Sequence, residues 1–195
     1  MVNLTRIYTR TGDQGTTRLG DMSQTPKTDP RVQAYGDVNE ANAHLGHALA
    51  AGELDADVVE VLTTVQNDLF DVGADLCMPV VPEPEFPPLR VTQLYIDRLE
   101  GWCDQFNDEL PKLRSFILPG GTVGSALLQI ACTTVRRAER SAWAAYEQHG
   151  EDMNMLAITY LNRASDLLFI LARYANRESG DVLWVPGGER SGPDS

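Results

Sequence analysis

The stretch DVVEVLTTVQNDLFDVGADL, residues 57–76, decides the fold of this chain. Its apolar residues recur at intervals of three and four, which is the period of one face of an α-helix. They are Val58, Val61, Leu62, Val65, Leu69 and Val72. A helix with one apolar stripe must bury that stripe against other elements. The stretch therefore predicts an amphipathic helix that belongs to a larger helical core.

Four further segments share this periodicity, at residues 38–51, 92–106, 122–149 and 153–176. Chain breakers separate the helical segments: Gly52, a proline-rich linker at 79–88, and Pro111 with the turn FILPGG at 116–121. Proline and glycine cannot propagate a helix without cost. No segment shows the alternation typical of a β-strand. The pattern predicts an all-α, five-helix up-and-down bundle.

The first 35 residues differ from the rest. Residues 9–17 read TRTGDQGTT, and more turn formers follow them. We expect a long ordered loop that opens with a short extended piece at 4–9. The loop is basic within an acidic protein, through Arg6, Arg10, Arg18, Lys27 and Arg31. We predict a single domain with an N-terminal loop segment at 1–35, a helical bundle at 36–177 and a flexible tail at 178–195.

Composition excludes several classes of protein. At 195 residues and 21.5 kDa the chain fits one ordinary domain. A formal net charge of −12 argues against a nonspecific grip on nucleic acid or on an anionic membrane. Of the 16 basic residues only Lys27 and Lys112 are lysine. The remaining arginines suit bidentate phosphate contacts, although genome base composition would produce the same excess.

The three cysteines and the hydropathy pattern indicate a cellular compartment. Cys77, Cys103 and Cys132 are widely spaced, which argues against a zinc site or a disulfide framework and suits a reducing cytosol. Cys132 is either a core residue or a reactive thiol. No window approaches the length of a membrane span, so we expect a soluble, cytoplasmic protein.

The segment at 9–17 could bind a polyphosphate. Its glycines let the backbone approach a ligand and turn N–H groups inward, while Thr and Arg side chains add donors. The alternative is a solvated turn. Neither the P-loop pattern nor a strand followed by G-x-G-x-x-G is present, so the two common nucleotide-binding folds are not supported.

Two helical segments also carry unusual polar residues. The sequence RRAER at 136–140 places Arg136 and Arg140 on one face, and Glu139 can pair with Arg136 or with a neighbouring helix. The sequence LNRASD at 161–166 begins a polar stripe of Asn162, Asp166 and Arg173. An anion would explain the arginines and a specific hydrogen bond the asparagine. A solvated face and a helix–helix polar contact are the alternatives.

Together these segments resemble the PduO-type cob(I)alamin adenosyltransferases. That family shows Y-T-[KR]-x-G-D-x-G-x-T, K-x-D-x-R-V, F-x-L-P-G-G, R-R-A-E-R and N-R-L-S-D in this order. This chain matches them at 8–17, 27–32, 116–121, 136–140 and 162–166, with Ala164 in place of leucine. The resemblance implies a homotrimer of five-helix bundles with active sites at subunit interfaces. It also implies transfer of the 5′-deoxyadenosyl group from MgATP to cob(I)alamin, which gives adenosylcobalamin and triphosphate.

The resemblance also implies roles for individual residues. Phe116, Arg136 and Asn162 would be catalytic, with Phe116 keeping the lower nitrogenous ligand off cobalt. Magnesium would be held mainly through the ATP phosphates. The residues implied to bind ATP are Thr9, Arg10, Thr11, Gly12, Asp13, Gly15, Thr17, Arg18, Lys27, Arg136, Arg137, Glu139, Arg140 and Asn162.

Three positions depart from the family pattern. Asn39 stands where the family has aspartate, and Gln129 and Cys132 stand where it has histidine and arginine. With Phe116 they would lie on the corrinoid side or at the subunit interface. The aspartate and arginine form a salt bridge there in the family, so both of its partners are neutral in this chain.

These departures leave more than one function open. The chain could be the adenosyltransferase, or a divergent paralogue that binds ATP or a corrinoid as a carrier, sensor or partner subunit. A helical interaction module without a ligand is a third reading. A flavin reductase and an adenosylcobalamin-dependent enzyme are the protein partners that the first reading implies.

Overall fold

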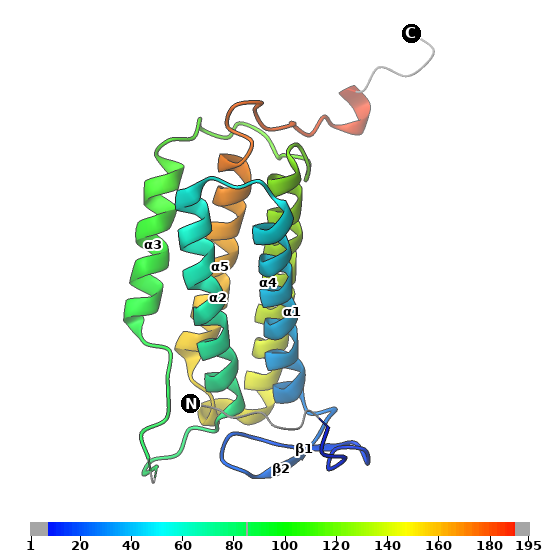
Figure 1. The fold of residues 1–195 in the computed structure, drawn as a ribbon, viewed down its shortest axis with the longest axis vertical. Helices are drawn as coiled ribbons and strands as arrows, with labels where there is room; N and C mark the ends of the chain where they lie inside the picture. The colour runs from blue at the N-terminus through cyan, green and yellow to red at the C-terminus, as the bar shows by residue number, and fades with distance from the viewer. Residues whose placement is uncertain (1–7, 85, 190–195) are drawn as a thin grey trace.

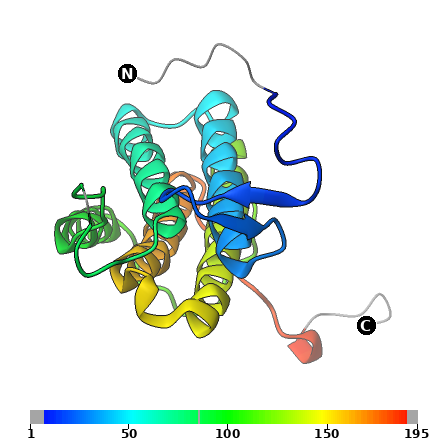
Figure 2. The same ribbon diagram turned by 90° about the horizontal axis from the view of Figure 1, so that it is seen from below.

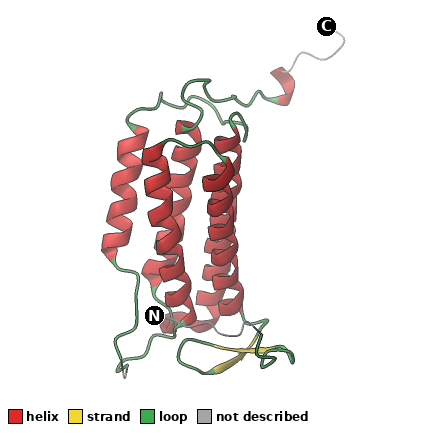
Figure 3. Ribbon diagram, viewed as in Figure 1, coloured by secondary structure: helices red, strands yellow, loops and turns green. Residues whose placement is uncertain are grey.

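The computed structural model describes residues 8–84 and 86–189, which form a bundle of long helices with a small β-hairpin at one end (Figures 1 and 3). The helices are α1 (Pro30–Ala51), α2 (Ala56–Cys77), α3 (Gln93–Asn107), α4 (Val123–His149) and α5 (Met155–Tyr174). Strands β1 (Thr16–Arg18) and β2 (Gln24–Pro26) pair antiparallel, with Thr17 opposite Thr25. Short 3-10 turns lie at Gly150–Asp152 and Gly187–Glu189. The predicted all-α bundle is confirmed.

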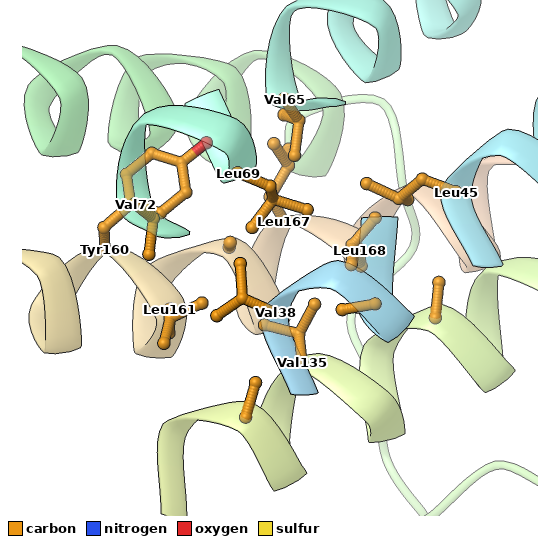
Figure 4. Packing of buried hydrophobic residues seen from close by; sticks show 14 of the residues in the cluster. Val38, Leu45, Val65, Leu69, Val72, Val135, Tyr160, Leu161, Leu167 and Leu168 are labelled. Carbon is orange, nitrogen blue, oxygen red and sulfur yellow. The ribbon is translucent and has the colours of Figure 1, made fainter. Parts of the chain in front are cut away.

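The core fills the space between α1, α2, α4 and α5. Helix α1 packs between α2 and α4, while α5 contacts α2, α3 and α4 (Figure 2). Residues from all four central helices meet in this core, among them Leu45, Leu69, Val135 and Leu168, each fully buried (Figure 4). The six residues of the predicted α2 stripe are all buried. The stripe was therefore sufficient to orient α2.

Helix α1 begins earlier than the sequence reading expected. It starts at Pro30 rather than at 38, so the expected boundary between residues 35 and 36 falls inside the helix. Asp29 is its N-cap and accepts a hydrogen bond from the Arg31 amide at 2.8 Å. Proline is well suited to the first helical position because its missing N–H is not needed there. The pair Asp29-Pro30 was thus a helix-start signal hidden among turn formers.

The N-terminal loop also contains the hairpin, which the sequence analysis did not anticipate. Its strands have three residues each, too few to show a periodic pattern. The extended piece expected at 4–9 lies mostly outside the described residues. The hairpin sits beyond the end of the bundle where α1 begins and α4 ends, and the α3–α4 connection lies at the opposite end (Figure 1).

Helix α5 is long and apolar enough to cross a membrane by length and composition, contrary to the expectation that no window approaches a span. However, 56% of its most apolar window is buried inside the bundle. Its apolar residues pack against three other helices. The hydropathy of α5 is therefore explained by its place in the core.

Candidate functional site

The glycine-rich segment folds into a small cradle at the hairpin end of the bundle. Gly15 has φ 81°, a left-handed conformation that favours glycine. Its carbonyl accepts from the Lys27 amide at 2.8 Å, and its amide donates to the Gly12 carbonyl at 3.2 Å. These bonds close the segment onto β2. A cavity of about 310 Å³ results, lined by Thr11, Gly12, Thr16, Thr17, Arg18 and Gln24.

Basic side chains surround this cradle. The Lys27 ammonium lies over Gly12, where an added Cβ would come within 3.1 Å of Nζ. Arg18 is exposed and donates to the Met22 carbonyl at 3.0 Å. Arg10 has φ 62° although it is not glycine, and its guanidinium lies 5.7 Å from the centre of the Tyr8 ring. A left-handed backbone conformation is uncommon for residues other than glycine, and it is often found at ligand-binding sites.

Asp29 ties the hairpin to the bundle. It accepts from Thr25 Oγ1 in β2 at 3.0 Å and lies 2.9 Å from Nε2 of His149, the last residue of α4. Burial opposes ionisation of Asp29, but hydrogen bonds from the Arg31 amide, His149 and Thr25 outweigh it, so the pKa of Asp29 lies below its ordinary value. The cradle is thereby fixed to the ends of two helices.

The three arginines at 136, 137 and 140 of α4 differ in their partners. Arg136 is exposed and has a 3.4 Å contact from Nε to Ser165 Oγ, and Arg140 donates to the Arg136 carbonyl at 3.0 Å. Arg137 instead forms an ion pair with Glu40 of α1 and lies 3.8 Å from Asp37. An anion would therefore have to compete with these carboxylates for Arg137, whereas within residues 8–84 and 86–189 no carboxylate forms an ion pair with Arg136 or Arg140.

Glu139 and Asn162 connect α4 with α5. Asn162 Nδ2 donates to Glu139 Oε1 at 3.2 Å, so Glu139 pairs with the neighbouring helix rather than with Arg136. Asp166 accepts from Arg163 at 2.8 Å. Arg173, the third residue of the predicted polar stripe, is separate from the other two: its side chain is buried and bonded to Asp181. The site candidate on α5 is therefore Asn162.

Phe116 lies at the other end of the molecule. Its side chain is 78% exposed, and its ring meets the Trp184 ring edge-on at a centroid distance of 6.1 Å. The Trp184 amide donates to the Phe116 carbonyl at 2.8 Å. Sequence reasoning did not identify Trp184 as a neighbour of Phe116, because no local pattern links positions 68 residues apart.

The three departures from the family pattern occupy different environments. Asn39 is exposed on α1. Gln129 and Cys132 are buried, at 8% and 1% exposure, and the Cys132 thiol donates to the Ser165 carbonyl at 3.2 Å. Burial raises the pKa of Cys132. Cys132 is a core residue, which corrects the expectation that it faces the corrinoid side or a subunit boundary.

One protomer does not bring the predicted site residues together. Arg136 lies 13 residues from each end of α4, a separation of about 20 Å at 1.5 Å per residue. The cradle lies beyond one end of α4, and Phe116 lies at the other (Figure 1). The chain thus carries three separate candidate surfaces: the cradle, the exposed arginines of α4 with Asn162, and Phe116.

The fold and these surfaces define a class of five-helix proteins with a basic, glycine-rich cradle at one end of the bundle. The family model described as cobalamin adenosyltransferase matches residues 7–175. The chain belongs to this family. The resemblance seen in the sequence motifs is confirmed.

Individual relatives agree with the family assignment. The chain is 62% identical over 190 residues to a corrinoid adenosyltransferase of Mycobacterium tuberculosis (strain ATCC 25618 / H37Rv), covering 97% of this chain and 98% of the relative. It is 39% identical over 180 residues to a corrinoid adenosyltransferase of Bacillus subtilis (strain 168), covering 90% and 89%. A variant PduO-type ATP:corrinoid adenosyltransferase from Lactobacillus reuteri, complexed with cobalamin and ATP, superposes with a TM-score of 0.83. It is 34% identical, with 92% of this chain and 99% of that chain covered.

Proposed function

We propose that this protein transfers the 5′-deoxyadenosyl group of ATP to the cobalt of cob(I)alamin, giving adenosylcobalamin and triphosphate. The observation that carries the proposal is the basic, glycine-rich cradle of residues 11–27 in a chain of net charge −12. Family membership supplies the corrinoid as the second substrate.

The reaction suits the residues at the candidate site. Cobalt(I) is the nucleophile, so a cobalt–carbon bond forms with its electron pair while the C5′–O bond breaks and triphosphate leaves with the bonding pair. No side chain has to remove a proton. The protein must align the 5′ carbon with cobalt and stabilise charge on the departing oxygen. Arg136, Arg140 and Lys27 are the cations that would supply this stabilisation.

Magnesium fits this site only as a companion of the substrate. Within residues 8–84 and 86–189 no group of three or more His, Cys, Asp or Glu side chains is placed to hold a metal ion. Magnesium binds readily through phosphate oxygens and water with few protein ligands. We propose that it enters with ATP and shares the phosphate charge with the arginines.

The separation of the surfaces supports an assembly in which copies of the chain share each site. The cradle lies beyond the end of α4, and Arg136 lies about 20 Å from that end along the helix, so a triphosphate is too short to contact both in one protomer. Placing the cradle of one copy beside α4 of the next would remove this gap. A homotrimer with sites between subunits satisfies this requirement.

The corrinoid side of the site would include Phe116. Its ring is exposed and would occupy the space beneath cobalt that the lower nitrogenous ligand needs. Excluding this ligand makes cobalt(II) easier to reduce. We place the reaction in the cytoplasm, with a flavin reductase supplying the electron and an adenosylcobalamin-dependent enzyme receiving the product.

A carrier or sensor without turnover is the less well supported function. The argument for a carrier or sensor is that Asn39 and Cys132 are neutral where the family has a salt bridge. The core position of Cys132 removes it from the corrinoid side, and the 62%-identical relative bears the name corrinoid adenosyltransferase. The relatives also favour an enzyme over a helical interaction module.

The test is direct. Purified protein is mixed with MgATP and chemically reduced cobalamin, and adenosylcobalamin is followed by its absorption spectrum. Product and triphosphate should form in equal amounts. Binding of ATP without any adenosylcobalamin would overturn the proposed enzyme and favour the carrier.

A further inference from the structure

The C-terminal segment after α5 folds back onto the loop that carries Phe116. We call residues 181–185 the strap. The Leu118 amide donates to the Val182 carbonyl and the Trp184 amide to the Phe116 carbonyl, both at 2.8 Å. Ile117 and Leu183 form a β-bridge between these bonds. The strap is therefore the strand partner of residues 116–118.

One buried arginine is bonded to both segments of this two-stranded ribbon, the strap and the α3–α4 connection. Arg173, in the last turn of α5, is 4% exposed. Its Nε donates to Asp181 Oδ2 at 2.8 Å, at the start of the strap. Its Nη2 donates to the Pro111 carbonyl at 2.8 Å, ahead of Phe116 in the α3–α4 connection. The fork geometry of the guanidinium allows one side chain to hold two segments at once.

Asn176 fixes the far side of the same loop. Its Nδ2 donates to the Gly120 carbonyl and its Oδ1 accepts from the Thr122 amide, each at 2.9 Å. Gly121 has φ 98°, and a Cβ there would lie 2.4 Å from the Asn176 amide group. The loop is thus anchored to α5 on both sides, with the Phe116 ring exposed between the anchors.

We call the bonds from Arg173 to Asp181 and Pro111 the latch. The latch is needed because few other contacts hold the strap against residues 116–118. Phe116 and Trp184 are 78% and 42% exposed, so core packing does not fix their rings. An isolated two-stranded ribbon is marginally stable in water. Oδ1 of Asp181 is buried and has no hydrogen-bond partner in the part of the chain that the structure describes. The carboxylate would therefore be poorly stabilised without Arg173.

We propose that Arg173 is a positioning residue for adenosyl transfer: through Asp181 and Pro111 it holds the strap against residues 116–118 and so sets the Phe116 ring at the lower face of the corrinoid. This inference rests on the proposed function, because it assumes that Phe116 meets the corrinoid. Arg173 itself need not contact a substrate.

The test is the variant Asp181→Asn, which keeps the shape of the side chain and removes its charge. Hydrogen exchange at the Leu118 and Trp184 amides reports whether the strap is released. The absorption and electron paramagnetic resonance spectra of cob(II)alamin, with ATP bound, report whether the lower ligand is displaced from cobalt. We expect faster exchange at both amides, a smaller fraction of four-coordinate cobalt(II), and a kcat lower by about tenfold. The KM for ATP should remain within about twofold, since the cradle lies at the other end of the bundle.

The matched control is Asp55→Asn. Asp55 pairs with Arg177 at 2.7 Å on the surface near the same end of the bundle, so its loss should change neither the spectra nor the exchange of the two amides. Arg173→Lys should keep part of the four-coordinate cobalt(II) signal that Asp181→Asn loses, because lysine can reach Asp181 but lacks the fork that also reaches Pro111. Thermal unfolding confirms that each variant is folded.

The outcomes separate the latch from the proposed function. If wild-type protein forms no four-coordinate cobalt(II), the proposed role of Phe116 fails, whereas the amide exchange still tests the latch. A released strap with an unchanged cobalt(II) spectrum would overturn the positioning role. An unchanged exchange rate in Asp181→Asn would overturn the latch itself.

Discussion

Removing the Asp29 carboxylate should loosen the hairpin end of the molecule. In Asp29→Ala, helix α1 loses its capping bond to the Arg31 amide, worth about 1 kcal/mol. The contacts with Thr25 and His149 are lost as well, each worth about 0.5–1.5 kcal/mol net. We expect the free energy of unfolding to fall by about 2–4 kcal/mol in total. For a domain of this size, at about 2–4 °C per kcal/mol, that corresponds to a decrease in Tm of about 4–16 °C.

The effect should depend on pH in a defined direction. The pKa of Asp29 in the folded protein lies below the ordinary value of 3.8. Its ionised form is thus favoured by folding, and the stabilisation is complete above pH 3.8 and disappears as the pH falls through the folded pKa. The difference in Tm between wild type and Asp29→Ala should shrink in acid. Thermal unfolding followed by circular dichroism at neutral and acidic pH measures both quantities.

A second N-cap aspartate provides the control. Asp55 caps α2 without a side-chain capping bond, and its ion pair with Arg177 is exposed, so Asp55→Ala should cost no more than about 1 kcal/mol. Asp29→Asn should restore the capping term, since asparagine caps about as well as aspartate. Equal losses of stability in the Asp29 and Asp55 variants, or a Tm difference that persists in acid, would refute the reasoning.

Three further predictions concern the site and the thiols. Arg136→Ala should lower kcat/KM by about 100-fold, while Arg177→Ala, whose guanidinium pairs with Asp55 far from the cradle, should change steady-state kinetics less than twofold; equal effects would remove Arg136 from the site. Gly15→Ala, at φ 81°, should cost about 1–2 kcal/mol and weaken ATP binding in calorimetric titration, and unaltered affinity would argue against the cradle. Burial raises the pKa of Cys103 from 9.0 to about 11. The thiol should therefore react with iodoacetamide about 100-fold more slowly at pH 8 than an unperturbed thiol, and its contribution to stability should be lost as the pH rises from 9.0 toward 11. Alkylation at the rate of a free thiol, followed by mass spectrometry, would contradict this.

The helices could be predicted from sequence because their determinants are local. The α2 stripe repeats at helical spacing, and burial of all six stripe residues follows from that repeat. The start of α1 was equally local, in Asp29 and Pro30, but the surrounding turn formers obscured it. The hairpin was not predictable, because strands of three residues show no alternation and are held by the bond from the Lys27 amide to Gly15.

The candidate site was predictable residue by residue but not in space. Arg173 lies 11 positions after Asn162, about three helical turns, so the helical period predicts that both belong to one polar stripe. Asp181 and Pro111 cover the end of α5 and bury Arg173, and neither is near it in the sequence pattern. The pairing of Arg137 with Glu40 likewise depends on α1 lying beside α4. Such contacts are set by tertiary packing.

The arginine excess divides into two groups according to its partners. Those with a carboxylate partner are Arg90, Arg98, Arg137, Arg163, Arg173 and Arg177. Among the residues that the structure describes, no carboxylate is within ion-pair distance of Arg10, Arg18, Arg31, Arg114, Arg136, Arg140, Lys27 or Lys112.

Genome base composition explains an excess of arginine. It does not explain why, within the described part of the chain, the cations of the cradle and two arginines of α4, Arg136 and Arg140, lack carboxylate partners although the net charge is −12. The cradle lies beyond the end of α4 (Figure 1), and Arg136 and Arg140 lie about 20 Å and about 14 Å from that end along the helix. Like charges brought together at a subunit boundary repel each other, so a shared site would assemble at an electrostatic cost. On the proposed assembly, ATP, as a polyanion, would offset this cost by binding between the cradle and the arginines of α4. The charges proposed to bind the nucleotide would then couple its binding to the contact between subunits.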